Sequence, residues 1–398
     1  MKDTYTLKVI ESFSCTGSQC PRTCCTGWQI EVETDLLEKW RAIPDAGERE
    51  GILNILPEGV DGESQVLMHE DDLRCPFLDK DDLCKIQIKH DQSYIPTTCR
   101  EYPRINVETA YRGYQTASLS CPEIVRLVLF DKHMESPYDV FRLQPDQFKQ
   151  QDSHAEVNYS LDKFVDNILN QDKFPLGLRL FYMTHFFSDF FEHVQHSEIK
   201  PAQIDGLNNQ IKQTLYDANL SIKQKKIKVD PVTAGSYWKS IYSLCLSRDI
   251  DKVFMEDETS SLTKVIENSG DTHDDYIKIY EMLQGYIKHS RPILSTQYRK
   301  LLKTYIQVYF KNNGFPLAPR DKTTSITLVQ CMTGLSMLQL LLWMQLKNKN
   351  TIEDSFLQEL IVEVQRKYAH NLSTVNYLEE NSHMLQIGLY NTCFIDLF

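Results

Sequence analysis

Apolar residues recur with the spacing of amphipathic helices through most of the chain after about residue 160. The segments with this period are 161–170, 175–195, 211–220, 237–246, 276–289, 293–310, 327–346 and 351–368. Few segments between them show the alternation typical of strands, and no internal repeat is evident. Consecutive amphipathic segments of this kind pack into helical bundles. The pattern therefore predicts an all-α domain over residues 151–398.

The first 150 residues have a different pattern, made of short segments separated by turns. It predicts a strand at 28–32, a helix at 34–43, a loop at 45–72, a strand at 110–119 and a helix that begins at Pro122. The polar stretch 144–154 favours a boundary just before the helical part. We therefore expect a mainly α protein, with a small irregular α+β cysteine-rich metal-binding domain at 1–150 followed by the helical domain.

Charge and hydropathy narrow the class of protein. The formal net charge of −12 argues against nucleic-acid binding, which needs a basic face. The uncharged stretch 323–346 is long enough to cross a membrane, but its glutamines, threonine and serine favour a buried helix. The first residues lack the basic and apolar regions of a signal peptide. We therefore expect a cytoplasmic protein without stable membrane insertion. Its negative net charge would favour lysine-rich protein partners.

Cysteines are concentrated in the part that is not helical. Eight of the eleven are Cys15, Cys20, Cys24, Cys25, Cys75, Cys84, Cys99 and Cys121, while Cys245, Cys331 and Cys393 are scattered. The cytosol keeps ordinary thiols reduced, so clustered cysteines there favour a metal centre over disulfides. All eight are candidate metal ligands, and four thiolates suffice for one iron–sulfur cluster or one structural zinc ion.

Spacing alone leaves the metal open. None of the pairs has the Cys-x2-Cys spacing common in zinc ribbons, which favours iron–sulfur over zinc. Arg22, Arg74, Arg100 and Arg104 lie near the cysteines in sequence, where they could offset the charge of a thiolate cluster. Tyr94, Tyr102, Tyr111 and Tyr114 are candidates for a cation–π pocket, although ordinary packing of a small domain is the favoured explanation for each.

The cysteine motifs resemble those of the flagellin lysine-N-methylase family (FliB). The resemblance rests on Cys15, Cys20, Cys24-Cys25, Cys75-Pro-Phe-Leu, Leu83-Cys84-x-Ile, Cys99-Arg-x-Tyr-Pro-Arg and Ser120-Cys121-Pro-Glu. These motifs cover residues 13–125, and they are also similar to those of small zinc- or iron-chelating cysteine-cluster proteins. The Ser120-Cys121-Pro-Glu element and the length of 398 residues favour the methylase family.

The resemblance implies an S-adenosylmethionine-dependent protein-lysine N-methyltransferase that acts on flagellin and depends on a cysteine-bound [4Fe–4S] cluster. It identifies neither the catalytic residues nor the S-adenosylmethionine site. The chain has no Gly-x-Gly-x-x-Gly loop and no Cys-x3-Cys-x2-Cys run, so neither a Rossmann-type nor a radical methyltransferase is indicated. The alternative is a non-enzymatic zinc- or iron-binding or delivery protein. We expect the helical domain to dock the protein substrate.

Overall fold

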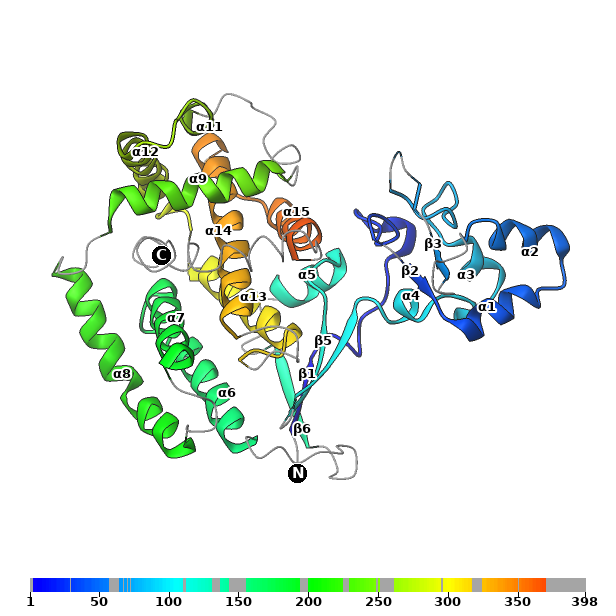
Figure 1. The fold of residues 1–398 in the computed structure, drawn as a ribbon, viewed down its shortest axis with the longest axis horizontal. Coiled ribbons are helices and arrows are strands. Elements are labelled where there is room, and N and C mark those ends of the chain that lie inside the picture. The colour runs from blue at the N-terminus through cyan, green and yellow to red at the C-terminus, as the bar shows by residue number, and fades with distance from the viewer. Residues whose placement is uncertain are drawn as a thin grey trace.

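The computed structural model describes residues 3–28, 30–56, 64–66, 68–69, 71, 73–109, 112–130, 137–142, 155–193, 200–224, 229–247, 250, 261–294, 296–316, 324–349 and 351–369. A large helical body and a smaller lobe are joined by a four-stranded sheet (Figure 1). Helices dominate the described chain and the strands are few, so the predicted mainly α class is confirmed.

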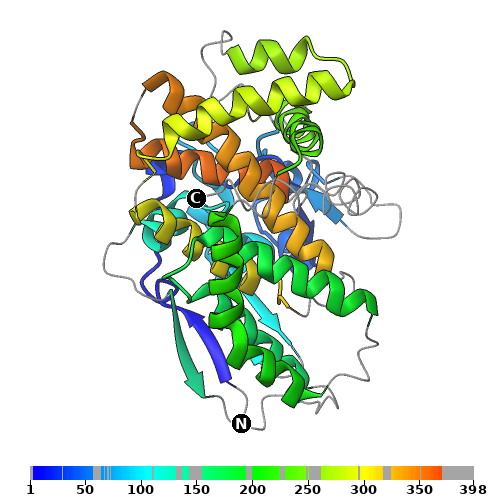
Figure 2. The same cartoon turned by 90° about the vertical axis from the view of Figure 1, so that its left-hand side faces the viewer.

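The strands of this sheet come from segments that precede and follow the lobe residues in the sequence. Its strands are β1 (Asp3–Leu7), β4 (Arg104–Glu108), β5 (Arg112–Ala117) and β6 (Tyr138–Arg142). In the order β4-β5-β1-β6, β1 pairs in parallel with β5 and antiparallel with β6, and β4 pairs antiparallel with β5. In Figure 2 the blue β1 and the teal β6 run side by side at the lower left. The pairing brings the start of the chain beside residues more than a hundred positions later.

The lobe has its own elements and a small hydrophobic core. They are β2 (Ile30–Val32), α1 (Thr34–Arg41), α2 (Ala46–Leu53), β3 (Ser64–Val66), α3 (Lys85–Lys89) and α4 (Thr97–Glu101), with the short 3-10 turns η1 (Gly17–Gln19) and η2 (Gln92–Tyr94). The predicted strand and helix at 28–43 are confirmed. The predicted loop at 45–72 is wrong at two places: Asp45 caps α2 by accepting a hydrogen bond from the Glu48 N–H, and β3 pairs antiparallel with β2.

The body is built of long helices. They are α5 (Pro122–Leu129), α6 (Ala155–Leu169), α7 (Leu176–His193), α8 (Pro201–Lys223), α9 (Pro231–Ser247), α11 (Ser261–Glu267), α12 (His273–Ser290), α13 (Thr296–Asn312), α14 (Thr324–Lys349) and α15 (Asp354–Val364), which continues into the π-helical turn η5 (Gln365–Ala369). The predicted strand at 110–119, the start of α5 at Pro122 and the eight helical segments are confirmed within the described residues.

Hydrophobic packing does not divide at residue 150. Leu7, Leu119 and Val125 belong to the same core as the helices of the body, whereas the lobe core is drawn from residues between Ile30 and Ile95. The division into 1–150 and 151–398 therefore stays a prediction, and packing runs across its boundary because β1, β5 and α5 cover the helices. The polar stretch 144–154 that suggested the boundary lies outside the described residues.

A buried ionic group joins the sheet to the helices. Arg112 on β5 and Lys311 on α13 both pair with Asp162 on α6, and the Lys311 Nζ–Asp162 Oδ1 distance is 2.9 Å. The Tyr114 hydroxyl donates to the same carboxylate at 3.2 Å. Because all of these side chains are buried, each charge depends on its partners.

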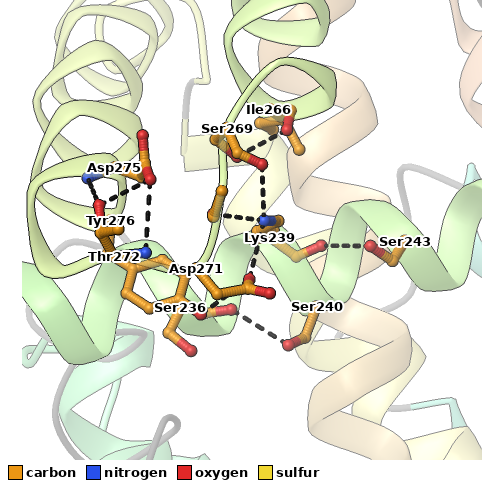
Figure 3. Close-up of polar contacts among 11 residues, drawn as sticks. Ser236, Lys239, Ser240, Ser243, Ile266, Ser269, Asp271, Thr272, Asp275 and Tyr276 are labelled. Atoms are coloured by element: carbon orange, nitrogen blue, oxygen red, sulfur yellow. Dashed lines mark hydrogen bonds and ion pairs between the residues drawn. The ribbon is translucent and has the colours of Figure 1, made fainter.

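Two further features fix the body. Helices α9 and α12 approach so closely that a Cβ on Gly235 would lie 1.9 Å from the carbonyl oxygen of Tyr276. Lys239 Nζ, from α9, donates to the backbone oxygen of Gly270 at 2.7 Å and pairs with Asp271 at 2.9 Å, just before α12 (Figure 3).

Within the described residues, one helical stretch, Thr327–Lys347, is long and apolar enough to cross a membrane, and its most apolar window is entirely buried in the body.

Candidate metal centre

The eight candidate cysteines come from three segments that meet near the junction of lobe and body. The first segment, residues 15–25, runs from β1 toward the lobe. The second, residues 75–99, lies in the lobe itself, and the third is the residue before α5. Each segment positions its thiols by local backbone contacts.

Residues 15–20 form a tight turn. Gly17 has a φ of +56°, which glycine adopts without strain, and its N–H lies 3.4 Å from the Cys15 sulfur. The Cys20 N–H donates to the Gly17 carbonyl at 3.0 Å, while the Cys20 thiol donates to the Arg22 carbonyl at 3.1 Å. The Cys15 side chain is exposed to solvent, so this end of the segment is open.

The adjacent Cys24 and Cys25 are held by different neighbours. The indole Nε1–H of Trp28 donates to the Cys24 carbonyl at 2.6 Å. The Cys25 carbonyl accepts from the Cys75 N–H at 2.9 Å, and Thr26 forms an antiparallel bridge with Arg74. Cys25 is thereby fixed against the second cysteine segment.

The second segment folds into a hairpin around its first two cysteines. The Leu78 N–H donates to the Cys75 carbonyl at 3.0 Å, and the Lys85 N–H donates to the Phe77 carbonyl at 2.8 Å. Cys84 is the residue before α3, and Cys99 lies within α4. Cys75, Cys84 and Cys99 all pack against the lobe core.

Cys121 is buried and lies directly before α5. Its position before the helix agrees with the prediction that the helix begins at Pro122. Burial raises the pKa of its thiol to about 11, together with the nearby charges of Cys20 and Cys15, while N–H groups at the start of α5 act in the opposite direction. Unlike the lobe cysteines, Cys121 is part of the core of the helical body.

The electrostatic neighbours of the thiols form two groups. Burial raises the pKa of Cys99 to about 12, and the charges of Cys25, Cys75 and Cys84 add to this effect. The pKa of Cys24 is raised mainly by its hydrogen bond with Cys25, and the nearby charges of Cys15 and Cys121 contribute. The same bond lowers the pKa of Cys25 to about 7, with a hydrogen bond from Thr23 acting in the same direction and burial acting against it. Cys24 and Cys25 are therefore hydrogen-bonded to each other, and each lies near a different group of cysteines.

The sequence analysis missed the residue that joins these segments. Arg366, in the π-helical turn η5, donates from Nε to the Ser120 carbonyl at 3.0 Å, from Nη1 to the Thr23 carbonyl at 3.0 Å, and from Nη2 to the Arg22 carbonyl at 2.8 Å. Each carbonyl is within two residues of a candidate cysteine. A lone arginine more than 240 positions after Cys121 carries no motif that would reveal this role.

The four arginines predicted near the thiols have other partners. Arg22 pairs with Glu359 of α15 at 3.3 Å, Arg100 donates to the Thr97 hydroxyl at 2.9 Å, and Arg104 lies over the Phe13 ring at 5.3 Å. Arg74 pairs with Asp82 and also helps to lower the pKa of Cys25. For Arg22, Arg100 and Arg104, no hydrogen bond to a cysteine sulfur is found among the described residues.

Of the four candidate tyrosines, Tyr102 lies at the site. Its ring is 5.4 Å from that of Trp28 in an edge-on arrangement, and its hydroxyl is 3.0 Å from the Ser120 hydroxyl. Tyr94 instead stacks on His90 in the lobe, and Tyr114 belongs to the buried ionic group around Asp162. Tyr111 lies outside the described residues.

The two other described cysteines do not join the candidate centre. Cys245 and Cys331 are buried within α9 and α14, as expected for single apolar side chains, and Cys393 lies outside the described residues. The ten described cysteines form no disulfide. In the described parts of the chain, no three His, Cys, Asp or Glu side chains have the spacing of a metal-binding group. The eight thiols are therefore gathered without being closed around a common point.

Comparison with known proteins gives matches to a flagellar biosynthetic protein and to two lysine-N-methylases. Over 125 residues the chain is 29% identical to the flagellar biosynthetic protein FliU of Salmonella muenchen, a match that covers 31% of this chain and 74% of FliU. It is 28% identical over 125 residues to the lysine-N-methylases of Salmonella choleraesuis and Salmonella typhimurium, covering 31% of this chain and 31% of each relative.

The chain thus matches less than a third of the length of those two methylases. No family model and no solved structure matches. The family resemblance drawn from the cysteine motifs is nevertheless confirmed: over about a third of its length, the chain is a homologue of the proteins named lysine-N-methylase.

Proposed function

We propose that this protein transfers methyl groups from S-adenosylmethionine to lysine side chains of flagellin, and that it does so in the cytoplasm with a cysteine-bound [4Fe–4S] cluster. The observation that carries this proposal is the meeting of eight cysteines from three segments in a homologue of lysine-N-methylases. The helical body is the proposed docking surface for flagellin, because grooves between packed helices are common binding sites.

The chemistry of the donor atoms, eight thiols, is the one that a cluster requires. Every one of the eight thiols is free, the Cys75 N–H and the Cys25 carbonyl join the first two segments, and Arg366 joins the first segment to the residue before Cys121. Thiolates are the ligands that iron–sulfur clusters and structural zinc prefer. Cys15, Cys20, Cys24, Cys25, Cys75, Cys84, Cys99 and Cys121 are the proposed ligands. When bound, a cluster with an open iron position would supply a Lewis acid for the amino and carboxylate groups of S-adenosylmethionine.

Aromatic side chains beside these thiols suit the sulfonium of the methyl donor. Trp28 is anchored to the Cys24 carbonyl, and Tyr102 is anchored to Ser120, the neighbour of Cys121. Cations bind favourably to aromatic ring faces, and tryptophan provides the strongest such contact. We therefore assign the sulfonium to the Trp28–Tyr102 pair.

The substrate lysine has to lose a proton before it can act as a nucleophile. A neutral amine is required because an ammonium group has no free electron pair, and the usual lysine pKa is near ~10.4. The amine nitrogen forms the new bond to the methyl carbon as the carbon–sulfur bond breaks, which leaves S-adenosylhomocysteine and a proton. Exclusion of water from the amine, or a nearby base, would release that proton.

The proposal is tested by incubating anaerobically purified full-length protein with flagellin and isotopically labelled S-adenosylmethionine. We expect label on flagellin lysines with the wild type and with Cys331→Ala, whose thiol is buried in α14. We expect none with Cys121→Ser. Metal-loaded wild type that transfers no label would overturn the proposal and favour the alternative, a non-enzymatic iron- or zinc-delivery protein.

A further inference from the structure

The eight cysteines are divided between two hydrophobic cores. Cys75, Cys84 and Cys99 pack against the lobe core, whereas Cys121 is buried in the core of the helical body. A single centre would have to combine ligands that belong to separately packed units. Each unit has enough thiols nearby for a centre of its own.

The dipeptide Cys24-Cys25 lies where the two sets meet. The Cys25 carbonyl is bonded to the Cys75 N–H at 2.9 Å, which fixes Cys25 to the lobe hairpin. On the other side, the guanidinium of Arg366 holds the carbonyls of Thr23 and Ser120 together, which fixes the residue before Cys24 to the residue before Cys121. Adjacent cysteines are thus tied to different segments of the fold.

We propose that the chain forms two separate four-thiolate metal sites. The lobe site consists of Cys25, Cys75, Cys84 and Cys99, and the junction site consists of Cys15, Cys20, Cys24 and Cys121. Both take a thiophilic metal centre, either an iron–sulfur cluster or zinc. This inference rests on the cysteine ligation in the proposed function and adds the division of the ligands and a second centre.

The two sites have different roles. The lobe core contains few buried side chains, among them Trp40 and Phe77, and small units of this kind often need a metal for stability. The lobe site is therefore structural. The junction site includes the exposed Cys15 and adjoins the Trp28–Tyr102 pair, so it is the accessible one. A catalytic metal site needs an open position, and at the junction site the exposed Cys15 is the ligand that S-adenosylmethionine would displace to create one.

The test uses cobalt(II) as a probe, because thiolate ligands give cobalt an intense charge-transfer absorption. Metal-free full-length protein is titrated anaerobically, and we expect two equivalents for the wild type and for Cys331→Ala. Cys24→Ser and Cys25→Ser alter adjacent positions, so they form a matched pair, and we expect one equivalent for each. A wild-type endpoint of one equivalent would overturn the inference.

Alkylation of the cobalt-loaded variants, mapped by mass spectrometry, identifies which site remains. In Cys24→Ser we expect Cys75, Cys84 and Cys99 to be protected, with Cys15, Cys20 and Cys121 modified. In Cys25→Ser the pattern reverses. Loss of protection at all remaining cysteines in both variants, with circular dichroism matching the wild type, would indicate one shared centre and contradict the division.

For a variant that does not fold, the wild type alone decides the question. As chelator is added, we expect the two sets of cysteines to lose protection at different concentrations, and a single concerted loss would refute two sites. The outcome is independent of methyl transfer. Two sites without transfer would refute only the proposed function, and transfer with one site would refute only this inference.

Discussion

Arg366 holds Thr23 by a hydrogen bond of 3.0 Å from its Nη1 to the Thr23 carbonyl, although 343 positions separate them in the sequence. The same guanidinium holds the carbonyl of Ser120, so one side chain connects the end of the helical body to two cysteine segments. Arginine suits this role because its planar group donates in several fixed directions. The π-helical turn that contains Arg366 is itself uncommon and occurs frequently at functional sites.

Replacing Arg366 should loosen the cysteine segments. In Arg366→Ala the carbonyls of Arg22, Thr23 and Ser120 lose their donor, and each partly buried acceptor left unpaired costs about 1–3 kcal/mol. We expect a lower free energy of unfolding in urea and weaker metal retention. Arg366→Lys should retain only part of the stability and of the metal retention, because an ammonium group cannot donate in the several fixed directions of the planar guanidinium.

The matched control for that experiment is Arg126→Ala on α5. Arg126 forms an exposed pair with Glu123, three positions earlier in the same helix. Exposed pairs contribute about 0–1 kcal/mol, so stability and metal retention should hardly change. If Arg366→Ala matched this control in both measurements, the guanidinium would have no part in holding the cysteine segments.

The buried ionic group around Asp162 predicts that removing one charge lowers the free energy of unfolding strongly. Asp162→Asn removes the carboxylate that pairs with the buried Arg112 and one of the two that pair with the buried Lys311, the other being Asp166 at 3.3 Å. Breaking a buried pair on one side costs about 3–5 kcal/mol, because a charge is left without a partner. We expect a loss of that order in urea unfolding. Asp271→Asn, at an exposed pair with Lys239, should change stability by about 1 kcal/mol or less.

Local signals explain what the sequence could predict. The helical period of apolar residues predicted the helices of the body, Pro122 predicted the start of α5, and the concentration of thiols predicted the candidate ligands. Each of these signals comes from residues close together in the chain. The prediction of a loop at residues 45–72 failed at α2, where Asp45 is a local capping signal, and at the three-residue strand β3, which is stabilised by pairing with the distant β2.

Long-range pairing lay beyond those signals. The strand β1 is stabilised by β5 and β6, whose residues lie more than a hundred positions away, so its own pattern was too short to identify it. The division of Cys24 and Cys25 between neighbours likewise depends on Cys75 and Arg366. No spacing rule within residues 15–25 could show it.

The capping box of α12 predicts a measurable pH dependence. Hydrogen bonding to Thr272 lowers the pKa of Asp275, whose Oδ2 accepts from the Thr272 hydroxyl at 2.7 Å (Figure 3). A lowered carboxyl pKa contributes stability that is present above the unfolded value, near ~3.9, and is lost as the pH falls through the folded value. The midpoint of thermal unfolding should therefore drop in acid.

The substitution Asp275→Asn isolates this contribution. The difference in melting temperature between wild type and variant should be largest near neutral pH and shrink as the carboxyl is protonated. Asp274→Asn, in the same first turn, leaves the capping bonds in place and should show no comparable convergence. A difference for Asp275→Asn that stayed constant from neutral to strongly acidic pH would contradict the capping role.

The close approach of α9 and α12 predicts that Gly235 tolerates no side chain. The added Cβ of Gly235→Ala would lie 1.9 Å from the carbonyl oxygen of Tyr276, so the helices must separate. Overpacking of this kind costs about 1–3 kcal/mol, and the backbone position of the clash favours the upper end. Gly285→Ala in α12 meets nothing within 4 Å and should be neutral or stabilising by up to about 1 kcal/mol in the same urea titration.

Truncation at the expected domain boundary tests how far packing crosses it. A fragment ending at residue 150 retains all eight cysteines but exposes the side chains of Leu7, Leu119 and Val125, which pack in the body core. Exposed apolar surface of that extent favours association. We therefore expect the fragment to aggregate in size-exclusion chromatography, whereas the full chain stays soluble. A soluble monomeric fragment that binds cobalt at both sites would show that β1, β5 and α5 fold without the helices, and the boundary near residue 150 would then mark an independent domain.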